Sequence, residues 1–252
     1  PETSRLAEQL IERFGLEGAT VELALQGDNP RDAAANAMAR RLEHMVAAGH
    51  TTIAAGWGRT LGAAAQRARS MHTSGVTLVD AFGHTTTADI APAVEVTNTL
   101  GLKFGAKVMH IPSPGFAPSG EVAANFYDSE PVRTALDRAR NADMVMVAVG
   151  IVGPESLLVT AGYLNNSEMK KISGEGAVGE VFGLYFDAAG KPVRPNALHP
   201  ISLTLEELSE SKRVIAAAGG TEKTAAVRGA IAAGIVDELA IDASLARALL
   251  ED

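Results

Sequence analysis

The amino-acid sequence predicts an α/β fold, a three-layer open and mainly parallel sheet with helices on both faces. Segments with the periodicity of strands alternate with segments with the periodicity of helices along the chain. Two continuous apolar runs, Met144–Val149 and Val214–Ala218, are typical of parallel strands buried on both faces. The hydrophobic residues make up 46% of the chain and include few aromatics, which suits packed layers. The pattern predicts fold class and leaves strand order open.

The first half of the chain alternates between predicted helices and predicted strands. Gly15 ends the first helix, and Asn29 with Pro30 supplies an N-cap and a first-turn proline for the second. Gly49 ends that second helix. The predicted helices are Ser4–Phe14, one that begins at Pro30, Leu61–Arg69 and Ala91–Leu100, and the predicted strands are Thr20–Leu25, Thr51–Ala55, Val76–Asp80 and Lys107–Ile111.

The second half continues the alternation around a glycine-rich insert, 170–193. Thr221 and Asp242 are predicted N-caps, and Asp187–Gly190 is predicted to turn a hairpin between Leu184–Phe186 and Pro192–Val193. The other predicted elements are the helices Val132–Arg140, Glu222–Ala233 and Ala243–Leu250 and the strands Met144–Val149, Val214–Ala218 and Glu238–Ile241. Since no repeat, low-complexity tract or charged linker divides the sequence, residues 1–252 are expected to form one domain.

Composition excludes several classes of function. The formal net charge of −8 disfavours nucleic-acid binding by this chain alone, because such binding depends on an excess of lysine and arginine. A chain without cysteine has no disulfides or thiolate metal sites, and its histidines lack ligand spacing, so no metal and no cofactor are expected. No export signal or long apolar run is apparent, which predicts a cytoplasmic protein. The start at Pro1 suggests a piece of a longer protein.

The strongest candidate for a binding site is Gly56-Trp57-Gly58-Arg59-Thr60, between a predicted strand and a predicted helix. In an open parallel sheet such turns lie at the carboxyl ends of strands, where ligands bind. Gly56 and Gly58 allow close backbone approach, the helix start offers free N–H groups, and Arg59 and Thr60 can donate to a phosphate. The alternative is a tight turn with a solvated Arg59 and a packed Trp57.

Three further positions are candidates. Lys223 follows Ala218-Gly219-Gly220 at a helix start, where a cation opposes the helix dipole unless an anion compensates it. Glu180 stands alone in a glycine-rich apolar stretch and could accept hydrogen bonds from sugar hydroxyls or neutralise Lys223. Asp80 ends a strand and could do the same, while Asp80 with His84 is a weak pair for proton transfer. The alternatives are a solvated lysine and surface carboxylates.

In order and spacing these segments resemble the effector-binding domain of SorC/DeoR-type sugar-binding transcriptional regulators. The resemblance covers nearly the whole chain and rests on Gly56–Leu61, Ala142–Gly150, Gly176–Glu180 with Tyr185–Asp187 and Gly190, and Ala218–Gly220 with Lys223. It implies the sugar isomerase, glucosamine-phosphate deaminase and CoA-transferase type of fold. It also implies that Gly58, Arg59 and Thr60 hold a phosphate, that Glu180 contacts the sugar and that Lys223 reaches one of them.

The expected function is that of an effector-binding domain that senses a phosphorylated sugar and has no catalytic residues. The resemblance implies assembly into dimers or tetramers and a helix-turn-helix domain that carries the DNA contacts, outside this chain. The alternatives are a sugar-phosphate isomerase or deaminase on the same fold, since fold does not settle function, and an assembly domain whose pocket binds nothing.

Overall fold

A computed structural model describes residues 2–25, 27–71, 73–87, 90–195 and 197–251, so both end residues of the predicted 1–252 domain lie outside the described residues. A seven-stranded sheet crosses its centre, and every neighbouring pair in it is parallel. From one edge to the other the strands are β1 (Gly18–Glu22), β13 (Glu238–Asp242), β12 (Val214–Ala218), β6 (Met144–Ala148), β2 (Thr52–Ala55), β3 (Thr77–Asp80) and β4 (Lys107–Met109).

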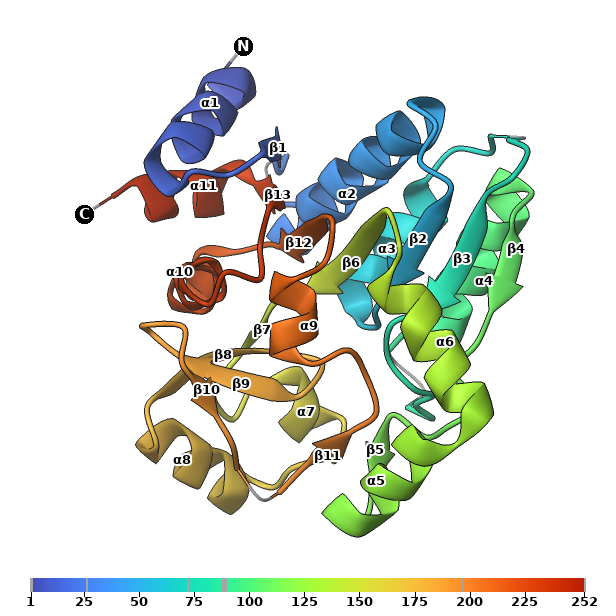
Figure 1. Cartoon of the computed structure of the whole chain (residues 1–252). Coiled ribbons are helices and arrows are strands. Elements are labelled where there is room, and N and C mark those ends of the chain that lie inside the picture. Colours follow the sequence, from blue (N-terminus) through green and yellow to red (C-terminus); the bar gives the residue numbers. More distant parts are fainter. Residues whose placement is uncertain (1, 26, 72, 88–89, 196, 252) are drawn as a thin grey trace.

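Helices cover both faces of this sheet, which confirms the predicted three layers (Figure 1). Successive strand residues point to opposite faces, so Ile53 and Ala55 of β2 belong to one core cluster and Ala54 belongs to the other. The first cluster contains residues of α2 (Pro30–Ala47), α3 (Arg59–Arg67) and α4 (Ala93–Phe104), and the second contains residues of α1 (Glu2–Phe14), α6 (Glu130–Arg140), α10 (Thr224–Ala232) and α11 (Ala243–Leu250).

Two of the predicted N-caps are confirmed and one is wrong. The Asn29 side chain accepts from the Arg31 amide at the start of α2, and the Asp242 carboxylate accepts from two amides at the start of α11. Thr221 instead begins a 3₁₀ turn, η1 (Thr221–Lys223), which has no side-chain cap, and α10 starts only at Thr224. Gly220, with φ 98°, occupies the N-cap position of this turn, so Thr221 is its first residue and not its cap.

The insert contributes three strands to a small antiparallel sheet below the main one (Figure 1), and β7, directly after β6, contributes the fourth. The order is β10 (Pro192–Val193), β9 (Leu184–Asp187), β8 (Ala177–Val181) and β7 (Gly150–Ile151). The predicted hairpin of β9 and β10 is confirmed. Sequence patterns missed β7 and β8, because they are short and rich in glycine. The remaining elements are β5 (Phe116–Ala117), α5 (Gly120–Asp128), α7 (Leu157–Thr160), α8 (Asn166–Gly174), β11 (His199–Pro200) and α9 (Leu205–Ser209).

The chain reverses its direction across the sheet between β2 and β6. From β2 it proceeds through β3 to β4 at one edge, and from β6 it proceeds through β12 to β13 toward the other. The loops that leave the carboxyl ends of β2 and β6 therefore diverge and leave a crevice between them, the usual place for a ligand in an open parallel sheet.

Candidate functional site

A cavity of about 270 Å³ opens at the carboxyl ends of β2, β6 and β12. It contains side chains from the loops after these strands, from the start of α2 and from the small antiparallel sheet. The residues that line it are Asn29, Arg31, Trp57, Gly58, Arg59, Thr60, Ala148, Val149, Gly150, Ile151, Glu155, Leu157, Glu180, Phe182, Gly219, Glu222 and Lys223. The structure thus brings the predicted Gly58–Thr60, Glu180 and Lys223 to one place, although they are far apart in sequence.

The loop before α3 presents backbone N–H groups to this cavity. Gly58 is the N-cap of α3 with φ 119°, a conformation that favours glycine, and no side chain caps the helix. The first-turn amides are therefore available to an anion, and Thr60 lines the cavity one residue into the helix. Gly56 supports the loop from behind, because its amide donates to the Met146 carbonyl at 3.0 Å, and it does not line the cavity.

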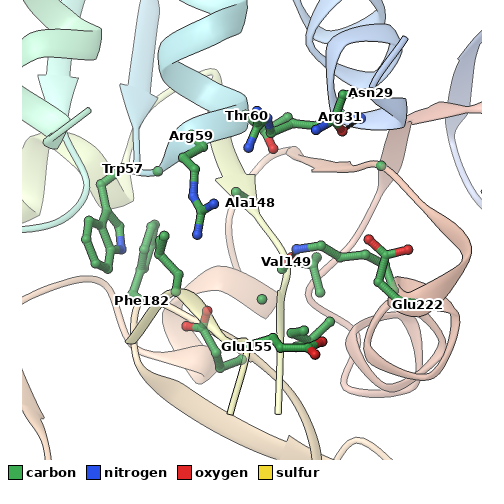
Figure 2. Close-up of a pocket in the computed structure, with 17 residues that line it drawn as sticks. Asn29, Arg31, Trp57, Arg59, Thr60, Ala148, Val149, Glu155, Phe182 and Glu222 are labelled. Atoms are coloured by element: carbon green, nitrogen blue, oxygen red, sulfur yellow. Dashed lines mark hydrogen bonds between the residues drawn. The ribbon is translucent and has the colours of Figure 1, made fainter. Parts of the chain in front are cut away.

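Two guanidinium groups face this cavity without a partner in the described part of the chain. Arg59 extends from the start of α3 into the space between Trp57 and Val149 in Figure 2, and neither Arg59 nor Arg31 has a side-chain hydrogen bond or ion pair there. Arg31 reaches the site because α2 begins directly over Gly219, where an added Cβ would lie 2.6 Å from the Pro30 carbonyl oxygen.

Lys223 approaches from the opposite loop. Its Nζ donates to the Val149 carbonyl oxygen at 2.5 Å, at the end of β6. Burial lowers the pKa of Lys223 below its usual value, the carboxylates of Glu180 and Glu222 oppose that shift, and Arg59 and Arg31 add to it. Because those two guanidinium groups are close enough to disfavour its charge, a bound anion would stabilise all three cations together.

Glu180 is a buried carboxylate in the cavity wall. It lies on β8 opposite Gly150 of β7, and an added Cβ on Gly150 would lie 1.7 Å from its Oε1, so only glycine leaves room for it. Its Oε2 accepts from the Gly183 amide at 2.7 Å. Burial raises the pKa of Glu180, opposed by this amide and by Lys223. A carboxylate held in this way can accept hydrogen bonds from ligand hydroxyls.

Aromatic rings close one side of the cavity. Trp57 stacks on Phe82 with ring centroids 5.1 Å apart, and Phe82 stacks on Phe182 at 5.8 Å. Trp57 and Phe182 line the cavity, while Phe82 and Phe116 pack behind them. Rings packed in this manner have few alternative positions, so this wall is rigid.

The structure does not bring Asp80 to the cavity. The Asp80 carboxylate is buried at the end of β3, where it accepts from the Thr97 hydroxyl at 2.8 Å and the Ile111 amide at 3.2 Å, and it lies 3.0 Å from His110 Nδ1. Burial raises its pKa, and these three partners oppose the rise. The Asp80–His84 pair considered for proton transfer is not formed, because His110 takes that place and the His84 side chain is exposed.

Sequence reasoning missed Asn29, Arg31, Glu155, Phe182 and Glu222. The one available signal was Asn29 with Pro30, which marked a strand-to-helix turn of the same kind as Gly56–Thr60. Among the described residues no group of three histidine, aspartate or glutamate side chains could hold a metal ion. Within the same ranges no helix is long and apolar enough to cross a membrane.

Comparison with known sequences gives consistent relatives. A family model described as "Putative sugar-binding domain" matches residues 1–251. The erythritol catabolism regulatory protein EryD of Brucella abortus is 29% identical over 218 residues, which are 86% of this chain and 68% of that protein. The transcriptional regulator LsrR of an Enterobacter strain is 31% identical over 59% of this chain and 47% of its own length. The matched regions thus span about half to two thirds of these relatives.

Solved structures show the same fold. A DeoR family transcriptional regulator from Listeria monocytogenes superposes with a TM-score of 0.87 at 24% identity, over 99% of this chain and 100% of that one. The full-length sorbitol operon regulator SorC from Klebsiella pneumoniae gives 0.88 at 18% identity, over 100% of this chain and 82% of its own. At these identities the likeness concerns the fold alone.

Proposed function

Because the chain belongs to the family of sugar-binding domains of SorC/DeoR-type bacterial transcriptional regulators, we propose that its cavity binds a phosphorylated sugar as effector. The observation that carries this proposal is that three cationic side chains line the same cavity. Arg31, Arg59 and Lys223 line a single cavity beside the uncapped start of α3. Cations of like charge repel one another when no ligand is present, and a phosphate removes that repulsion.

The rest of the cavity suits the hydroxyl groups of a sugar. Glu180, Glu155 and Glu222 are carboxylates that accept from hydroxyls, and Asn29 both donates and accepts. Apolar side chains, among them Trp57 and Phe182, offer a surface for the carbon chain. Asp80 is left out of the proposed contacts, because its carboxylate accepts hydrogen bonds from the Thr97 hydroxyl and the Ile111 amide. The Brucella relative is named for erythritol, a polyol, which agrees with a polyhydroxylated effector.

The effector would act by shifting an equilibrium between conformations or assemblies of a cytoplasmic regulator. It can do so only to the extent that it binds one of them more tightly. We infer that the domain forms a dimer or tetramer. We also infer that the DNA contacts belong to a separate helix-turn-helix domain, since this chain has a formal charge of −8. Neither inference alters the ligand chemistry above.

Calorimetric titration of phosphorylated and free sugars tests the proposal. Charge-assisted hydrogen bonds contribute about 1.5 to 3 kcal/mol, so Arg59→Ala and Lys223→Ala should each weaken binding of a sugar phosphate by about ten- to a hundredfold. Free sugars should bind poorly to every variant. Arg67→Ala is the matched control, because Arg67 lies on the same helix, pairs with Asp32 and does not line the cavity. Its affinity should equal that of the unaltered domain.

Equal affinity for phosphorylated and free sugars, or unchanged affinity in both cation variants, would contradict the phosphate site. Turnover of a bound sugar phosphate would favour the enzyme on the same fold instead. Among the described residues, the carboxylate–imidazole pair formed by Asp80 and His110 lies outside the cavity lining, which does not favour that alternative.

A further inference from the structure

Phe182 is the one non-glycine residue with a positive φ among those described, at 59°. It forms the two-residue turn of the β8–β9 hairpin together with Gly183, whose φ is 76°, because Val181 pairs with Leu184 across the turn. A turn with two positive φ angles strongly favours Asn-Gly, since a bulky side chain is strained in the left-handed region. Phenylalanine therefore occupies a turn position at which the backbone conformation alone favours asparagine.

The contacts of the ring explain what this strain maintains. Phe182 is 2% exposed and lines the cavity, and an added Cβ on Gly56 would lie 2.4 Å from its Cε1. Phe82 stacks on the Phe182 ring as well. The turn itself is held by the Gly183 amide, which donates to Glu180, a residue of the same cavity wall. Backbone strain that several contacts maintain is typical of functional sites.

We propose that Phe182 determines effector specificity by closing the sugar end of the cavity, so that the effector is a phosphorylated sugar or polyol of five carbons or fewer. This inference rests on the proposed function. The cavity of about 270 Å³ lies at the small end of ligand pockets, which span roughly 300–1,000 Å³. Phe182 and Trp57 lie together on one side of it, away from Arg31 in Figure 2. The Gly183 amide of the same turn donates to Glu180, the proposed sugar contact, so the ring adjoins the carboxylate that would bind the sugar.

The number of hydroxyl partners agrees with a short chain. Glu180 accepts from the Gly183 amide next to Phe182, and Glu155 also lines the cavity. Each carboxylate can accept from one or two hydroxyls, which a tetrose or pentose phosphate supplies. A longer chain would have to displace the Phe182 ring, which packs closely against Gly56 and Phe82. Since a packed interior does not deform gradually, the affinity should fall sharply when the ligand gains one carbon beyond the length that fits.

The test is a calorimetric panel of aldose phosphates and polyol phosphates of three to six carbons, with inorganic phosphate as the shortest probe. The unaltered domain should bind four- or five-carbon members at least about tenfold more tightly than six-carbon members. Phe182→Asn keeps a residue that suits the turn and removes the ring, and it should reduce this ratio to about threefold or less. Its affinity for inorganic phosphate should stay the same.

Phe116→Leu is the control, because Phe116 belongs to the same aromatic cluster and does not line the cavity. It should keep the original length preference. Equal binding of five- and six-carbon members by the unaltered domain would overturn the inference, as would an unchanged preference in Phe182→Asn with unchanged phosphate affinity. Failure of the unaltered domain to bind any phosphorylated member would instead overturn the proposed function, and this inference with it.

Discussion

The amino ends and the carboxyl ends of the central strands both carry arginine and lysine, and they differ in what balances those charges. At the amino ends Arg41 and Arg213 share the buried carboxylate of Glu238, at 2.5 Å and 2.9 Å, and Arg69 pairs with Glu43 at 2.6 Å. At the carboxyl ends the guanidinium groups of Arg31 and Arg59 face the cavity without such a partner in the described residues.

The difference distinguishes the arginines that have a carboxylate partner within the chain from the two that we propose to bind the ligand. A buried ion pair whose partners belong to the same chain is complete, and removing either member leaves an uncompensated charge. The carboxyl ends do have acids, yet some are engaged elsewhere. Asp242, for example, accepts from the Gly220 amide at 2.8 Å and from amides at the start of α11. Three other acids line the cavity, Glu155, Glu180 and Glu222. Within the described residues none of them forms an ion pair with Arg31 or Arg59, so a bound anion would give the two guanidinium groups a partner.

The largest expected effect is at the amino ends. Glu238→Gln leaves Arg41 and Arg213 with a neutral partner in a buried position, and it should lower the free energy of unfolding by about 3 kcal/mol. Urea denaturation measures this change. Glu22→Gln is the control, since Glu22 pairs with a largely exposed Arg40 and should cost at most about 1 kcal/mol.

Glu238→Gln should leave the affinity for a sugar phosphate unchanged wherever the variant remains folded. A loss of affinity comparable to that of the cavity variants would break the comparison, because it would mean that the charges at the amino ends contribute to ligand binding.

A second prediction uses two arginines of one helix. Arg31 lies in the first turn of α2 and lines the cavity, whereas Arg41 lies ten positions further along and binds Glu238. Arg31→Ala should weaken sugar-phosphate binding by about tenfold, which is 1.4 kcal/mol, with little change in stability. Arg41→Ala should lower stability with no change in affinity. Titration calorimetry and urea denaturation on both variants give the four values, and equal effects of the two substitutions on affinity would refute the assignment.

Much of this site could be predicted from the sequence, because strand-to-helix turns are recognisable. The carboxyl ends of the parallel strands that precede these turns share one edge of the sheet. That reasoning predicts Gly58–Thr60 and Lys223, and the structure brings them together because their strands, β2 and β12, both neighbour β6. Strand order was not predictable. Asp80 and Arg31 follow strands of similar appearance, and only the packing of α2 on Gly219 brings Arg31 to the cavity.

Phe182 could not be predicted for a different reason. Turn recognition relies on residues that fit the backbone conformation, and Phe-Gly is not among the preferred sequences of this turn. The conformation is imposed by tertiary contacts with Gly56, Phe82 and Glu180's bond to the Gly183 amide. Sequence preferences for turns fail where function or packing overrides them. The mismatch between Phe182 and its turn therefore indicates that this residue has a functional or packing role.

A third prediction concerns acid stability at the amino ends. The pKa of Asp143 is lowered to about 2. Burial raises this pKa, but hydrogen bonds from the amides of Thr51 and Thr52 and the ammonium of Lys212 together lower it by more. A depressed pKa stabilises the folded state above the unfolded value of 3.8, and this contribution is lost as the pH falls from about 4 to about 2. Asp143→Asn should therefore reduce the pH dependence of the urea midpoint over that range. A midpoint with the same pH dependence in both proteins would contradict the assignment.

The smallest expected effect separates two side chains at the carboxyl ends. Thr221 begins η1 without capping it, so Thr221→Ala should change the free energy of unfolding by less than about 0.5 kcal/mol. Asp242→Ala should cost about 1 to 2 kcal/mol, because its carboxylate caps α11 and also holds the Gly220 amide. Urea denaturation of both variants under one set of conditions measures the contrast. If Thr221→Ala proved as costly as Asp242→Ala, the hydroxyl would be a cap after all, and the first turn beside Lys223 would have fewer free amides to offer a phosphate.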